Sequence, residues 1–86
     1  MPTGVAGTLE SNDCIITVKP SEEIQIVIHS VVEAFYRSQI EKVIRKTLQK
    51  SKRDKILVIC EDKGALDYAI EARLLTAIAR MEADHD

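Results

Sequence analysis

The chain has 86 residues, of which 45% are hydrophobic and 30% charged, and its formal net charge is -2 at pH 7. These values fit one small globular domain over residues 1–86 and exclude a disordered chain. With no excess of basic residues, one Phe, two Tyr and no Trp, the composition argues against a nucleic-acid partner recognised by base stacking. The longest apolar run, residues 56–60, is far too short to span a bilayer, so no membrane partner is expected.

The N-terminus has no feature of a targeting signal. Residues 1–4 include no basic residue, and no apolar run follows them. We therefore expect a cytoplasmic protein, in which Cys14 and Cys60 are free thiols rather than a disulfide.

Residues 4–18 predict two strands joined by a tight turn. Val5 and Leu9 favour extended backbone, whereas residues 10–13 (Glu-Ser-Asn-Asp) are short polar residues that are typical of turns. An apolar run then resumes the extended backbone. This pattern places Ser11 near the tip of a hairpin, exposed and clear of the core.

A third strand is predicted at residues 23–29, after a turn at Pro20. Ile24, Ile26 and Ile28 recur at every second position and therefore share one face of the strand. We expect a half-buried strand that places these three isoleucines in the core.

The next segment predicts a helix that ends near Lys50. Ser30 and Glu33 have the spacing of a capping box, which marks a helix start. The apolar residues that follow have helical spacing and form one stripe: Val32, Phe35, Tyr36, Ile40, Val43, Ile44 and Leu48. We expect this stripe to pack on the isoleucine strand, with Phe35 buried in the core.

Half of the twelve basic residues fall in one stretch, which we call the basic segment: Arg45, Lys46, Lys50, Lys52, Arg53 and Lys55. One interpretation is favourable placement of cations at a helix C-terminus, followed by a solvated loop. The other is a patch that contacts phosphates or an acidic partner surface. The sequence leaves both open, with the first favoured.

A fourth strand and a second helix complete the chain. The β-branched run at 56–60 predicts a strand covered on both faces or nearly so. Asp62 is the expected N-cap of the helix, and Asp67 is expected in or just after its first turn. The apolar stripe of this helix is Leu66, Ile70, Leu74, Ala77, Ile78 and Met81.

The predicted order is therefore strand, strand, strand, helix, strand, helix, or βββαβα. The first three strands are expected to form an antiparallel meander. The third and fourth are joined by a helix long enough for a crossover, so they are expected to run parallel in one sheet. With both helices on one face of the sheet, the fold class is an α+β two-layer sandwich.

No catalytic or metal-binding set is apparent in the sequence. His29 and His85 are the only histidines, and Cys14, Cys60 and His29 lack the close spacing of a zinc site. Adjacent carboxylates, such as those at 61–62, are more often solvated than catalytic. We expect no metal and no catalytic residue in this chain.

Two blocks of the sequence, at opposite ends of the chain, carry a family resemblance. Residues 5–13 (Val-Ala-Gly-Thr-Leu-Glu-Ser-Asn-Asp) and 62–67 (Asp-Lys-Gly-Ala-Leu-Asp), the latter followed by Ala72 and Arg73, resemble the acyl carrier protein (gamma) subunit of citrate lyase. The resemblance implies that Ser11 carries 2'-(5''-phosphoribosyl)-3'-dephospho-CoA, covalently bound through a phosphodiester. It identifies no other cofactor-binding residue.

The resemblance also implies a function and partners. The cofactor thiol would hold acetyl and citryl thioesters and present them to the alpha (citrate transferase) and beta (citryl lyase) subunits, after a prosthetic-group transferase has attached the arm. This chain would then be a non-catalytic carrier. Two alternatives stay open: the acyl carrier subunit of malonate decarboxylase, and a small cofactor-free α+β interaction module in which Ser11 is a plain turn residue.

Overall fold

The computed structural model describes residues 2–31 and 34–84. Its elements are β1 (Gly4–Gly7), β2 (Cys14–Pro20), β3 (Gln25–Ser30), α1 (Ala34–Lys50), β4 (Ile56–Asp62) and α2 (Asp67–Ala83). This is the predicted order, and the predicted α+β class is confirmed. In the described part of the chain, neither helix is long and apolar enough to cross a membrane.

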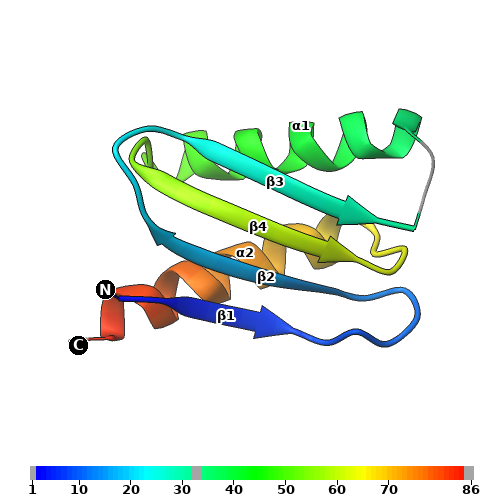
Figure 1. Cartoon of the computed structure of the whole chain (residues 1–86), viewed down its shortest axis with the longest axis horizontal. Helices are drawn as coiled ribbons and strands as arrows, with labels where there is room; N and C mark the ends of the chain where they lie inside the picture. Colours follow the sequence, from blue (N-terminus) through cyan, green and yellow to red (C-terminus); the bar gives the residue numbers. More distant parts are fainter. Residues whose placement is uncertain (1, 32–33, 85–86) are drawn as a thin grey trace.

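The four strands form one mixed sheet in the order β1-β2-β4-β3 (Figure 1). Strand β2 is antiparallel to β1 and to β4, while β3 runs parallel to β4, as the crossover through α1 predicted. The predicted meander of the first three strands is wrong, because β4 lies between β2 and β3. A continuous apolar strand gains most from a central place, where both of its edges are paired.

Both helices cover the same face of the sheet, as predicted (Figure 1). Alternate residues of β2 and β4 point at the helices and are fully buried: Cys14, Ile16, Val18, Ile56, Val58 and Cys60. The three isoleucines predicted for the core are partly buried against this cluster. Leu57 and Ile59 lie on the opposite face and are half-buried. The fourth strand, predicted to be covered on both faces or nearly so, is therefore fully buried only on the face toward the helices.

The expected burial of Phe35 is also wrong, since 74% of its surface is exposed. The buried residues of α1 are Ile40, Ile44, Thr47 and Leu48. Phe35 lies nine positions before Ile44, about two and a half helical turns, and therefore points away from the core. Leu66, included in the stripe of the second helix, is likewise 60% exposed because it precedes that helix.

Of the two helix-capping predictions, the first is not tested and the second is wrong. Val32 and Glu33 lie outside the described residues, and the capping box with them. Ser30 is the last residue of β3. Asp62 ends β4 and does not cap α2, whose N-cap is Leu66 with no side-chain hydrogen bond. Asp67 does lie in the first turn of α2, as predicted.

Candidate functional site

Ser11 lies at the tip of the β1–β2 turn, which we define as residues 8–13. Its side chain is exposed, as the turn chemistry predicted. Gly7 precedes the turn with φ of 111°, a conformation in which a Cβ would meet the Cys14 carbonyl oxygen. A larger residue at this position would disturb the turn that holds Ser11.

Hydrogen bonds within the turn fix its shape. The Thr8 amide donates to the Cys14 carbonyl oxygen at 3.1 Å, and the Asp13 amide donates to the Glu10 carbonyl oxygen at 3.2 Å. The Thr8 hydroxyl donates to Asp13 Oδ2 at 2.7 Å and accepts the Glu10 amide at 3.2 Å. Ser11 is therefore presented on a fixed loop rather than a loose one.

Asp13 anchors the turn to α2. Arg73 donates to it through Nε (3.1 Å to Oδ1) and Nη2 (2.8 Å to Oδ2), and the Cys14 amide donates to Oδ1 at 2.7 Å. The Arg73 hydrogen bonds, followed by that of Thr8, hold the pKa of the Asp13 carboxyl well below its usual range. Asp13 is therefore ionised at neutral pH. Sequence reasoning noted both residues as parts of the two blocks but missed their pairing.

The turn is also joined to the β4–α2 loop, which we define as residues 63–66. The Asn12 amide donates to the Lys63 carbonyl oxygen at 2.8 Å, and the Lys63 amide donates to the Asp13 carbonyl oxygen at 2.9 Å. The two sequence blocks, distant in the chain, thus lie side by side around Ser11.

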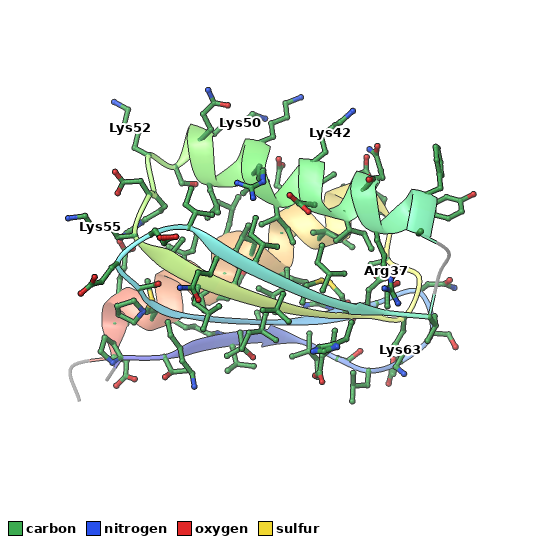
Figure 2. All side chains as sticks on the ribbon, turned by 45° about the horizontal axis from the view of Figure 1, so that its top comes forward. Arg37, Lys42, Lys50, Lys52, Lys55 and Lys63 are labelled. Atoms are coloured by element: carbon green, nitrogen blue, oxygen red, sulfur yellow. The ribbon has the colours of Figure 1, made fainter. Side chains whose placement is uncertain are left out.

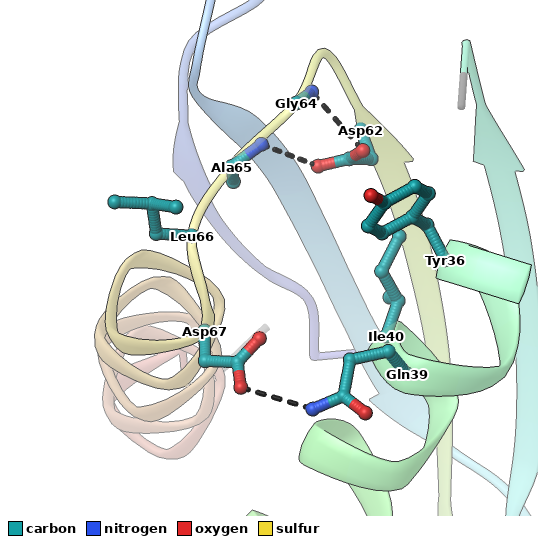
Figure 3. A pocket seen from close by; sticks show the side chains of 8 residues that line it. All are labelled: Tyr36, Gln39, Ile40, Asp62, Gly64, Ala65, Leu66 and Asp67. Carbon is teal, nitrogen blue, oxygen red and sulfur yellow. Dashed lines mark hydrogen bonds between the residues drawn. The ribbon is translucent and has the colours of Figure 1, made fainter. Parts of the chain in front are cut away.

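Asp62 holds the β4–α2 loop in place. Only 2% of its surface is exposed. Its carboxylate accepts hydrogen bonds from the backbone amides of Gly64 (3.0 Å) and Ala65 (2.9 Å) (Figure 3). It also accepts a hydrogen bond from the Ser30 hydroxyl at 2.9 Å. Glu61 points to the opposite face of the sheet, beside His29 on β3, so residues 61–62 are not an acid/base pair.

A cavity of about 280 Å³ opens between α1 and the β4–α2 loop (Figure 3). Its lining is mostly apolar and comprises Tyr36, Gln39, Ile40, Asp62, Gly64, Ala65, Leu66 and Asp67. Gln39 Nε2 donates to Asp67 Oδ2 at 3.0 Å and links α1 to α2 beside the cavity. The sequence did not predict this cavity, because its walls come from distant segments.

The basic segment lies at the other end of the molecule from the Ser11 turn. Figure 2 shows Lys50, Lys52 and Lys55 far from Lys63, which adjoins the turn. Lys50 forms an ion pair with Glu71 at 3.8 Å, and Arg53 forms one with Glu82. The two glutamates belong to α2. These ion pairs support the interpretation of the segment as a solvated helix end.

No metal site is found among residues 2–31 and 34–84, where no group of three or more His, Cys, Asp or Glu side chains is placed to hold an ion. Cys14 and Cys60 are fully buried free thiols on neighbouring strands. The Cys14 side chain, together with burial, raises the pKa of the Cys60 thiol.

Comparisons with known proteins find one matching family model and several curated relatives of high identity. Residues 2–81 match the model of the malonate decarboxylase delta subunit (MdcD) family. The citrate lyase acyl carrier protein of Halothermothrix orenii is 44% identical over 91% of this chain and 84% of its own length. That of Lactobacillus acidophilus is 47% identical over 98% of this chain and 88% of its own length.

A solved structure shares the fold. One chain of the Pseudomonas malonate decarboxylase hetero-tetramer in complex with malonate superposes with a TM-score of 0.77, over 93% of this chain and 84% of that chain. The two sequences are 16% identical, so this likeness concerns the fold alone.

Proposed function

Because this chain belongs to the family of citrate lyase acyl carrier proteins, we propose that it is the acyl carrier subunit of a citrate lyase complex. Its partners are the alpha (citrate transferase) and beta (citryl lyase) subunits and the transferase that attaches its prosthetic group. The chain itself performs no catalytic step, and it works as a single carrier domain in the cytoplasm.

The observation that carries this proposal is the exposed Ser11 side chain, which lies on a turn held by internal hydrogen bonds. The proposed prosthetic group is 2'-(5''-phosphoribosyl)-3'-dephospho-CoA, joined to Ser11 Oγ by a phosphodiester. The site fits a bulky group, since the side chain lies outside the core and a modifying enzyme has open access to it. When bound, the group supplies a terminal thiol that holds an acyl group as a thioester.

The chain's own residues orient this attachment point. Asp13 and Arg73 fix the turn to α2, and the backbone hydrogen bonds of Asn12 and Asp13 with Lys63 fix it to the β4–α2 loop. A rigid base under a long flexible arm limits the volume that the thiol explores. It thereby raises the effective concentration of the thiol at the active sites of a bound partner.

The malonate decarboxylase carrier is the second candidate, favoured by the description of the matched family model and by the shared fold. The much higher identity to citrate lyase carriers favours the first candidate.

The test is reconstitution of the loaded carrier with purified catalytic subunits of each enzyme. We expect citrate-dependent formation of oxaloacetate with the citrate lyase subunits. We expect no malonate decarboxylation with the malonate decarboxylase subunits. The reverse pattern would reassign the chain to malonate decarboxylase, and activity of the unloaded carrier would contradict the role of an arm.

A further inference from the structure

The cavity of Figure 3 adjoins the proposed attachment point. Gly64 lines the cavity, and a Cβ at Gly64 would lie 3.6 Å from Asn12 Oδ1. Asn12 is the residue after Ser11, and its backbone amide donates a hydrogen bond to the Lys63 carbonyl oxygen. A group tethered to Ser11 therefore starts beside one wall of this cavity.

The walls suit a neutral, amphipathic chain. Ile40, Ala65 and the ring of Tyr36 provide apolar surface, while the side chain of Leu66 points away (Figure 3). The Gln39 amide and the Asp67 carboxylate lie together at one side and offer a hydrogen-bond donor and acceptors. Such walls complement an acyl-amide chain with alternating methylene and peptide-like groups.

Charge and size set limits on what enters. Asp62 and Asp67 are the charged residues of the lining, and both are acidic, so they disfavour phosphates and carboxylates. At about 280 Å³ the cavity lies just below the common range of ligand sites, about 300–1,000 Å³. It therefore has room for the end of an arm but not for its nucleotide.

We propose that this cavity is a resting site for the neutral, thiol-bearing end of the Ser11-linked arm, and that it excludes the arm when its acyl group carries carboxylates. This inference rests on the proposed function. Because the arm is covalently tethered beside the cavity, weak contacts suffice to populate the bound state. A neutral arm is held in the carrier, whereas an anionic acyl group leaves it free to reach a partner.

The first test is the rate at which the arm's thiol reacts with iodoacetamide, followed by mass spectrometry of the loaded carrier. Ala65→Phe fills the cavity, and Ala79→Phe on the exposed side of α2 is the matched control. We expect the wild type and Ala79→Phe to react about threefold more slowly than Ala65→Phe, as for an arm that occupies the cavity about two-thirds of the time. Tyr36→Ser, which removes one wall, is a second variant that does not require a larger side chain to fit, and should also react faster.

The second test compares two nearly isosteric caps on the thiol, a neutral one from iodoacetamide and an anionic one from iodoacetate. In amide NMR spectra, the neutral cap should shift the Gln39 side-chain amide and the Ala65 backbone amide, relative to the unloaded carrier. The anionic cap should leave both near their unloaded positions.

Three results overturn the inference. Equal alkylation rates in all four loaded proteins, or equal shifts with both caps, would contradict the resting site while leaving the carrier function intact. A failure of the transferase to load wild-type protein, seen as an unchanged intact mass, would overturn the carrier assignment and this inference with it.

Discussion

At the scale of single residues, the Asp13 carboxylate holds the proposed attachment turn together. It accepts hydrogen bonds from Arg73 on α2, from the Thr8 hydroxyl and from the Cys14 amide. One charged group therefore links three parts of the site, and removing its charge should loosen the turn without unfolding the core.

Asp13→Asn should change the acid limb of the stability profile. Folding lowers the pKa of the Asp13 carboxyl from its ordinary value of 3.8, so its ionised form stabilises the fold above about pH 4–5. This contribution is lost as the pH falls below the pKa that Asp13 has in the unfolded chain, towards its lower pKa in the folded protein. Urea midpoints from pH 7 to pH 2 should show a gap between wild type and Asp13→Asn that is constant above about pH 5 and shrinks in acid. A gap of equal size at every pH would contradict the ionised role of Asp13.

The two cysteines yield a second prediction at this scale. Both thiols are fully buried, and the pKa of Cys60 is raised by its contact with Cys14 and by burial. Because the thiolate is the reactive form, iodoacetamide should modify neither residue in the native unloaded protein and both in guanidinium chloride. Rapid alkylation of Cys60 in native protein would show that the core opens locally.

At the scale of elements, helix α1 shows what periodicity does and does not determine. The pattern predicted a helix with one apolar stripe. The part of the stripe from Ile40 onwards packs into the core as expected, through Ile40, Ile44 and Leu48. Phe35 was assigned to the same stripe, although it lies on the opposite side of the helix.

Substitutions in α1 test this corrected orientation. Ile44→Ala should lower the free energy of unfolding by about 2–5 kcal/mol, because it leaves a cavity under a fully buried side chain. Phe35→Ala should change it by no more than about 0.5 kcal/mol, as for most exposed residues. Urea unfolding measures both values. A larger loss for Phe35→Ala than for Ile44→Ala would reverse the orientation of the helix.

The strand order marks a second limit of sequence reasoning. The parallel pairing of β3 and β4 was predictable from the intervening helix. The insertion of β4 between β2 and β3 was not, because it reflects which strand gains most from two paired edges. The Asp13–Arg73 ion pair and the cavity were missed for a related reason: they join residues that meet only after the sheet and helices pack.

At the scale of the whole molecule, the Ser11 turn and the basic segment lie at opposite ends (Figures 1 and 2). The proposed site therefore occupies one end of the domain, and any role of the basic segment in docking to a partner would be separate from it.

Replacing Lys50, Lys52 and Arg53 with Gln tests that separation. We expect the arm to be attached at the same rate as in wild type. Association with the catalytic subunits should be slower, chiefly at low salt, because long-range attraction between charges is screened as salt rises. Stopped-flow association across a salt titration measures this effect, and equal rates at every salt concentration would assign the segment to a solvated helix end alone.

The central claim is that Ser11 is the single attachment point of the arm. It is tested by the intact mass of the protein after incubation with the prosthetic-group transferase and its cofactor precursor. Wild type, Ser21→Ala and Ser51→Ala should each gain one adduct. Ser11→Ala should gain none, while its stability stays within about 0.5 kcal/mol of wild type, as for most surface changes. An adduct of the same mass on Ser11→Ala would contradict the account.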